Sequence, residues 1–171
     1  MIVLEVVDPE RRSDLLLNAG GGTPTPFLAS AFSEQAARVS PEGRWVAYQS
    51  NESGRIEIYL ESFPLPGRKV QVSTDGGVQP VWSRDGRELY FRSSTHLNAA
   101  SVSGAASLAV GQPRRLFRDV YLRPQGDGHT TYDVFPDGSF VFINVLKDAD
   151  AIAPSFVAVF NWFEELKSAA K

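Results

Sequence analysis

The chain has 171 residues, 43% of them hydrophobic, so it can bury a sizeable core as one domain or as an array of similar units. Its 17 basic and 20 acidic residues are interspersed and give a formal net charge of -3, which excludes the basic stripe of a nucleic-acid-binding protein. The absence of cysteine excludes a disulfide framework, thiolate metal sites and a cysteine nucleophile. A protein without cysteine is equally compatible with the cytosol and with the periplasm.

The N-terminal segment Ile2–Val7 is predicted to form a strand. It lacks the basic start, the longer apolar run and the small-residue cleavage site of a signal peptide. No apolar run in the sequence approaches the roughly 20 residues that cross a bilayer, so we expect no membrane partner. We expect a cytoplasmic location by default, or a periplasmic one if a leader has been removed.

The rest of residues 1–35 carries weaker signals. Leu15–Leu17 is too short to assign by periodicity, Gly20–Gly22 is typical of a loop, and Phe27–Leu28 is predicted to begin an outer strand. We interpret residues 1–35 as partial outer strands of a blade that starts before Met1.

A strand-turn-strand signature occurs in three copies, Ser40–Tyr48, Ser83–Phe91 and Phe135–Ile143. In each copy an acidic residue and a glycine supply the positive φ of a tight hairpin, and aromatic and β-branched residues then favour a strand. The turn glycines Gly43, Gly86 and Gly138 are separated by 43 and 52 residues. A strand-rich repeat of this length is typical of propeller blades.

The first complete unit, residues 36–77, is predicted to contain a strand that ends at Val39, a strand that ends near Ser50, and the strands Arg55–Ser62 and Lys69–Ser73. Along the second of these strands Trp45 and Ala47 share one face, and Val46 and Tyr48 share the other. Because both faces are apolar, we expect this strand to lie between two neighbouring sheets.

The later units are less regular. Residues 78–121 are predicted to contain the strands Val78–Trp82, Glu88–Arg92, Leu97–Val102 and Pro113–Phe117. Residues 122–160 begin with a long loop and show three strands, Thr130–Val134, Ser139–Val145 and Ser155–Phe160. In residues 161–171, Asn161 can cap a helix on which Trp162, Phe163 and Leu166 share an apolar stripe, so we expect a short docked helix at the C-terminus.

The segments that carry a family resemblance are Glu34-Gln35, Ser40–Tyr48, Glu57–Tyr59, Val72–Gly77, Pro80–Phe91 and Asn161–Lys167. Through them most of the chain resembles the C-terminal part of the TolB-like, WD40-like β-propeller repeat family, particularly the propellers attached to bacterial serine/threonine kinases. The resemblance implies an all-β fold, namely an incomplete β-propeller of about three to three-and-a-half four-stranded blades with a short C-terminal helix. For function it implies a non-enzymatic binding or protein-interaction module, because the family carries no shared catalytic set.

Two other functions stay open at this point: the propeller portion of a peptidase or sugar-processing enzyme, or the sensor end of a kinase, each encoded in a longer chain. The sequence has no Gly-x-Ser-x-Gly elbow, so a serine triad cannot be assembled from it. About three blades leave two apolar blade faces uncovered. We therefore expect the chain to complete a ring, either by self-association as a homodimer or larger oligomer or with missing blades, and to bind an unknown protein, peptide or sugar.

No residue set indicates a catalytic site, a cofactor site or a metal site. Asp85 and Asp137 are attributed to turn formation, because a hard cation needs several converging oxygen ligands. His129 precedes an inner strand and can face the central channel, which makes it the one candidate ligand-binding residue. His96 has no second ligand at metal-binding spacing.

The tryptophans offer an alternative site, a platform for a carbohydrate or peptide. Trp45 and Trp82 lie in equivalent regions of two repeat units, and Trp162 lies on the amphipathic tail. We predict that all three are buried between blades.

Overall fold

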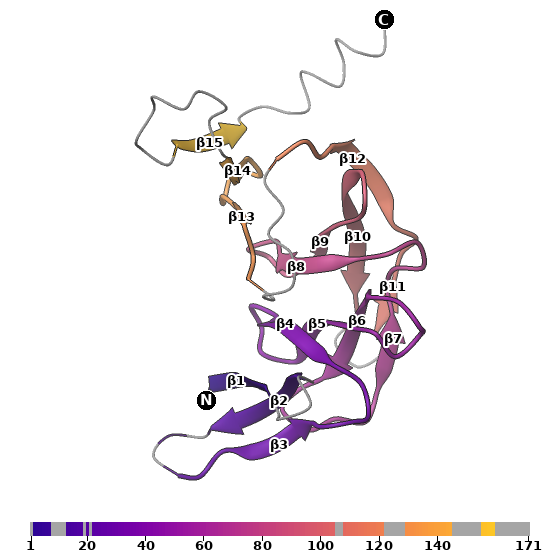
Figure 1. Ribbon diagram of the computed structural model, residues 1–171. Coiled ribbons are helices and arrows are strands. Elements are labelled where there is room, and N and C mark those ends of the chain that lie inside the picture. The colour runs from indigo at the N-terminus through magenta and orange to yellow at the C-terminus, as the bar shows by residue number, and fades with distance from the viewer. Residues whose placement is uncertain are drawn as a thin grey trace, which may run out of the picture.

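The computed structural model describes residues 2–7, 13–18, 20, 22–104, 108–121 and 129–144, and the main chain of residues 155–159. These residues form fifteen strands in four antiparallel sheets. Figure 1 shows the sheets side by side in a fan that runs from β1–β3 at one end to β13–β15 at the other. The predicted all-β fold class is confirmed.

The first sheet contains β1 (Ile2–Val7), β2 (Ser13–Asn18) and β3 (Thr25–Leu28), in that order. Leu15–Leu17, which periodicity left unassigned, belongs to β2. Its leucines alternate between the faces of the sheet, and Leu15 is fully buried against the second sheet. A run of three apolar residues is therefore a strand here because two neighbouring strands pair with it.

The second sheet has the order β4 (Glu34–Val39), β5 (Trp45–Ser50), β6 (Glu57–Ser62) and β7 (Lys69–Gln71). The pairing of β4 with β5 shifts between Gln35 and Arg38, around Ala36, which has a φ of 54°. All six residues of β5 are buried. This burial confirms that the strand lies between two sheets.

The third sheet contains β8 (Val78–Trp82), β9 (Glu88–Arg92), β10 (His96–Ser103), β11 (Ala109–Val110) and β12 (Arg114–Arg118). The sequence predicts one outer strand, but two segments share the outer edge of β10. Strand β12 pairs with residues 96–99, and β11 pairs with Val102 and Ser103. The eight-residue length of β10 leaves room for both.

The fourth sheet has the order β13 (Tyr132–Val134), β14 (Phe140–Asn144) and β15 (Ser155–Val159). All three strands lie within the predicted segments. The predicted C-terminal helix and its Trp162 fall outside the described residues.

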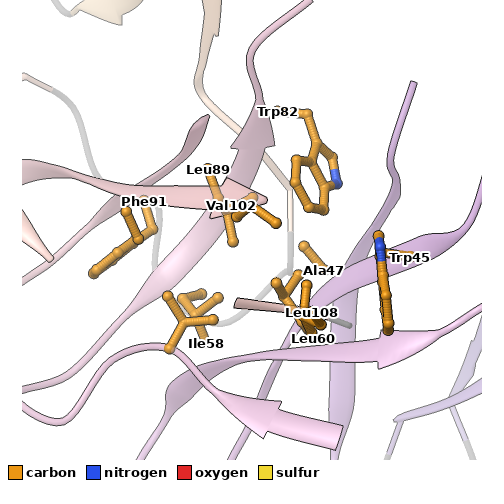
Figure 2. Close-up of a cluster of buried hydrophobic side chains, with 11 residues drawn as sticks. Trp45, Ala47, Ile58, Leu60, Trp82, Leu89, Phe91, Val102 and Leu108 are labelled. Carbon is orange, nitrogen blue, oxygen red and sulfur yellow. The ribbon is translucent and has the colours of Figure 1, made fainter. Parts of the chain in front are cut away.

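One apolar cluster fills each space between neighbouring sheets. Phe27 and Leu15 of the first sheet pack with Val46 and Tyr48 of β5. On the other face of β5, Trp45 and Ala47 pack with residues of the third sheet, as Figure 2 shows. Between the third and fourth sheets lie Val81, Leu97, Ala99, Leu116, Tyr132, Phe140 and Phe142.

The glycines of the three hairpin turns have the predicted positive φ. Gly138 has a φ of 85°, and its N–H donates to the carbonyl of Phe135. A Cβ added to Gly138 would meet no heavy atom within 4 Å, so the backbone conformation alone demands glycine.

We predict that Gly138→Val lowers the free energy of unfolding by about 1 to 2 kcal/mol, because a β-branched residue tolerates positive φ poorly. Gly138→Asn, the matched control, costs less, because asparagine adopts this conformation more readily. Denaturant titration of the two variants measures both effects. Equal midpoints for wild type and the valine variant would contradict the turn assignment.

A buried carboxyl group lies near the space between the first and second sheets. Glu34 is 3% exposed. Its Oε1 accepts a 2.5 Å hydrogen bond from the Ser30 hydroxyl, while its Oε2 has no hydrogen-bond partner in the part of the chain that the structure describes. Burial raises the pKa of Glu34, and the negative charges of Asp14 and Glu52 raise it further.

We predict that Glu34→Gln raises the denaturant midpoint at neutral and higher pH, where the wild-type carboxyl group must ionise in a buried position. Below the ordinary pKa of 4.5, Glu34 is protonated in the folded and unfolded states, so the advantage of the glutamine variant disappears. Glu42→Gln, which removes a carboxyl group at an exposed turn position, serves as the matched control. A constant difference between wild type and Glu34→Gln at every pH would contradict the assignment.

Candidate functional site

A pocket of about 490 Å³ is lined by residues of the inner strands β4 and β8, of β13 with the two residues before it, and of β14. We call it the axial pocket. Its lining residues are Arg38, Val39, Val81, Trp82, Thr130–Asp133 and Val141–Ile143. Three sheets therefore contribute to one site, which makes it sensitive to how those sheets pack.

Side-chain hydrogen bonds connect the inner strands around the axial pocket. The buried indole of Trp82 donates from Nε1 to the carbonyl of Arg38 at 2.9 Å. The exposed guanidinium of Arg38 donates from Nη2 to Thr130 Oγ1 at 3.0 Å. These two bonds join β4 to β8 and β4 to the segment that precedes β13.

A buried polar network connects the third sheet to β13 beneath the pocket. Arg92 donates from Nε to Asp119 at 2.5 Å and from Nη2 to the same carboxylate at 2.9 Å. Its Nη1 donates to Thr131 Oγ1 at 2.5 Å and to Gln79 Oε1 at 3.3 Å. The hydroxyl of Tyr132 donates to the carbonyl of Gln79 at 2.9 Å.

The charges of this network are inaccessible. The side chains of Arg92 and Asp119 have no solvent exposure, and each neutralises the other in a two-point ion pair. Burial raises the pKa of Tyr132 far above its ordinary value, so its hydroxyl stays protonated and donates. The network therefore fixes the packing of the third and fourth sheets, and a ligand meets only the lining side chains.

The lining presents one cation, one anion and apolar surface. Arg38 and Asp133 are exposed, and Val39 and Ile143 are each 37% exposed. Such a surface suits contact with a peptide segment that offers both apolar and polar groups.

At each junction between neighbouring sheets a polar side chain forms a hydrogen bond with the start of the next inner strand, and we call this the junction contact. The main-chain N–H of Ala36 donates to Glu5 Oε2 at 3.0 Å, and that of Gln79 donates to Gln49 Oε1 at 3.0 Å. At the last junction the side chain is the donor: Arg92 donates to the hydroxyl of Thr131, while the main-chain N–H of Thr131 donates to Gln79 Oε1 at 3.3 Å. In each case a polar side chain on one sheet holds the start of the next inner strand.

His129, the residue singled out by sequence, lies immediately before the pocket-lining segment Thr130–Asp133. Its side chain is exposed, and its carbonyl accepts a 2.7 Å hydrogen bond from Gln79 Nε2. Its role as a ligand-binding residue stays a prediction. His96 lies on β10, and its Nδ1 is 2.8 Å from the hydroxyl of Thr95.

The turn aspartates stabilise their own hairpins. Asp85 Oδ1 accepts from the Ser83 hydroxyl at 2.8 Å, and Asp137 Oδ1 accepts from the Ser139 hydroxyl at 2.7 Å. These hydrogen bonds lower the pKa of both carboxyl groups. Among the described residues, no group of three or more histidine, aspartate or glutamate side chains could hold a metal ion.

Trp45 and Trp82 are 6% and 8% exposed and lie in the cluster between the second and third sheets, as predicted. Figure 2 shows both rings at one end of that cluster. They are core residues, although Trp82 also borders the axial pocket. Trp162 lies outside the described residues.

Sequence reasoning missed the buried polar network and the junction contacts. The repeat itself contains the signal: Gln49, Arg92 and Asn144 each follow the turn glycine of their copy by six residues. A polar residue at the same position of every copy, near the end of a strand rich in apolar residues, indicates a shared structural role. Glu5 lies outside the three copies, so only the structure reveals its equivalence.

Radially arranged antiparallel sheets, with one apolar cluster between each neighbouring pair, define a partial β-propeller. Solved structures with the same arrangement are the crystal structure of TolB from Acinetobacter baumannii and the structure of a putative TolB from Agrobacterium tumefaciens. The TM-scores are 0.65 and 0.56, and the sequence identities are 20% and 23%. The fold is therefore that of a TolB-like β-propeller.

The matches cover 93% and 88% of this chain but only 39% and 52% of the two TolB chains. The chain thus corresponds to part of those proteins. No family model matches the sequence, and no curated protein matches it. In the part of the chain that the structure describes, no helix is long and apolar enough to cross a membrane.

We predict that Arg92→Met lowers the free energy of unfolding by about 3 to 5 kcal/mol, because it leaves the buried Asp119 carboxylate without its cation. The double variant Arg92→Met/Asp119→Leu is expected to lose less, since it removes both charges. Thermal and denaturant unfolding measure the difference. A double variant that is less stable than the single variant would contradict this account of the ion pair.

Proposed function

We propose that the chain is a non-enzymatic protein-interaction module that completes a ring by self-association. The observation that carries the proposal is the pair of open faces at the ends of the fan. Each internal space is filled by an apolar cluster, whereas in the described part of the chain no sheet covers the outer face of the first or fourth sheet.

The outer face of the first sheet is mostly apolar, since Ile2, Leu4, Val6 and Leu16 share it with Asp14 and Asn18. Val3 and Glu5 of β1 face the second sheet, where Val3 packs and Glu5 accepts from Ala36. By alternation, Ile2 and Val6 point the other way, and they are 61% and 45% exposed.

The outer face of the fourth sheet has the same character. Phe140 and Phe142 of β14 pack toward the third sheet. Val141 and Ile143 therefore point away from it, and both also border the axial pocket. The open face and the pocket are continuous, so a partner on this face also reaches the pocket.

A second copy supplies a complementary surface for each face. The first sheet of one copy placed on the fourth sheet of another buries apolar side chains on both sides. This contact joins unlike surfaces, so a repeated rotation closes a ring. The fold likeness to TolB, a larger β-propeller protein, supports a ring with more sheets than one copy provides.

Variants at the two faces test the proposal. We expect wild type to be a homodimer or larger oligomer by light scattering, and Ile2→Lys/Val6→Lys and Ile143→Lys each to be monomeric. An equimolar mixture of the two variants is expected to restore a dimer, because one intact face remains on each. Leu65→Lys, at a turn residue that is 79% exposed, is the control and keeps the wild-type mass.

A folded wild-type monomer at micromolar concentration would refute self-association. Association that survives both sets of lysine substitutions would place the interface elsewhere. Aggregation of wild type, without a defined oligomer, would instead indicate that blades of a longer chain cover the open faces.

A further inference from the structure

The first sheet differs from the other three in its innermost strand. The second, third and fourth sheets each begin with an inner strand that pairs with the strand after it: β4 with β5, β8 with β9, and β13 with β14. In the first sheet, β1 pairs with β2 on one edge, and no described strand pairs with its other edge.

The junction contacts show which strand of a sheet β1 represents. Glu5 of β1 accepts from the N–H of Ala36, as Gln49 of β5 accepts from the N–H of Gln79. Ala36 and Gln79 are themselves equivalent, because they have φ values of 54° and 56° and lie 43 residues apart. Strand β1 is therefore the counterpart of β5, a second strand whose inner neighbour is absent from the described sheet.

The free edge of β1 has little of the protection that exposed edges usually carry. Its six residues, Ile2–Val7, include no proline and no lysine, and their single charge is that of Glu5. None of them is buried. A regular strand with open main-chain groups and little charge readily accepts another strand.

We propose that the free edge of β1 binds an extended segment of a partner polypeptide, which adds antiparallel to β1 as its inner strand. Strand addition of this kind takes its affinity from main-chain hydrogen bonds and its specificity from side chains opposite the accepting strand.

The second sheet indicates the chemistry of that segment. There the residue opposite Gln49 is Gln35, and Gln49 Nε2 donates to Gln35 Oε1 at 3.1 Å. At the equivalent place β1 offers the carboxylate of Glu5, which can only accept. The partner segment therefore carries a hydrogen-bond donor, preferably lysine or arginine, opposite Glu5.

This inference does not depend on self-association. A second copy that covers Ile2 and Val6 occupies the outer face of the first sheet, and it leaves the edge of β1 unpaired. Failure of one proposal thus does not decide the other.

The chain's own inner strand provides the probe. A peptide of residues 34–44 that carries Gln35→Lys is titrated into the isotope-labelled full chain, and amide exchange is followed along β1. We expect the peptide to slow exchange of the β1 amides and to bind roughly five-fold more tightly than the matched peptide with Gln35→Glu, since like charges opposite one another repel. Glu5→Gln keeps an acceptor for Ala36 and is expected to reduce this preference.

The control is the full chain extended by a copy of residues 34–44 directly before Met1. Glu5 follows Met1 by four residues, as Gln49 follows Trp45, so the copied turn leads into β1 in the native register. In the extended chain the edge is filled, the β1 amides are protected, and the free peptide no longer binds there.

Three results would overturn the proposal. The first is unchanged exchange of the β1 amides at saturating peptide. The second is equal binding of the peptide to the original and the extended chain. The third is protection in the extended chain without any binding of the free peptide, which would assign the edge to a strand of the same chain rather than to a partner.

Discussion

The junction contact is the constraint on which the arrangement of the sheets depends. Apolar clusters hold the sheets together, but apolar packing is non-directional and tolerates sliding. A hydrogen bond from a main-chain N–H to one particular side-chain oxygen is broken when the sheets slide past each other. The N–H groups of Ala36 and Gln79 lie in buried, left-handed backbone, where an unsatisfied donor would cost about 1 to 3 kcal/mol. Each contact therefore fixes the position of one sheet on the next and, through the inner strands, the shape of the axial pocket.

More side-chain hydrogen bonds form at the junction between the third and fourth sheets, beside the axial pocket, than at the junction before it. A single amide suffices at Gln49, whereas at the next junction a buried arginine contacts Asp119, Thr131 and Gln79 together. Its guanidinium carbon also lies 5.7 Å from the centre of the Phe142 ring. In the described part of the chain, the fourth sheet contains the strands β13, β14 and β15. The hydrogen bonds of Arg92 hold this sheet in a defined position, because each of them requires a particular distance and angle between donor and acceptor.

The fold was predictable because the local and long-range signals agree. The turns of an acidic residue and a glycine, the strand patterns and the spacing of the copies together indicate propeller blades. Trp45 and Val46 on opposite faces of one strand imply a sheet on either side. The outer edge of the third sheet was not predictable, because Ala109 and Val110 form a strand only through their pairing with β10. The residues around the axial pocket were harder to predict from the sequence than the strands. Arg92 and Gln49 read as ordinary polar residues in sequence, and the partners described above lie 13 to 39 residues away along the chain. Only the fold brings them together.

The junction contacts differ in chemistry although the sheets resemble one another. Glu5 offers a carboxylate, Gln49 an amide and Arg92 a cation that needs Asp119. Proteins built from similar repeats risk pairing the wrong units while they fold. Here a mispaired sheet would separate the Arg92 guanidinium from Thr131, or the Glu5 carboxylate from the N–H of Ala36, and would lose stability in either case. The side chains at the junctions thus encode the order of the sheets, so that neighbours along the chain become neighbours in space.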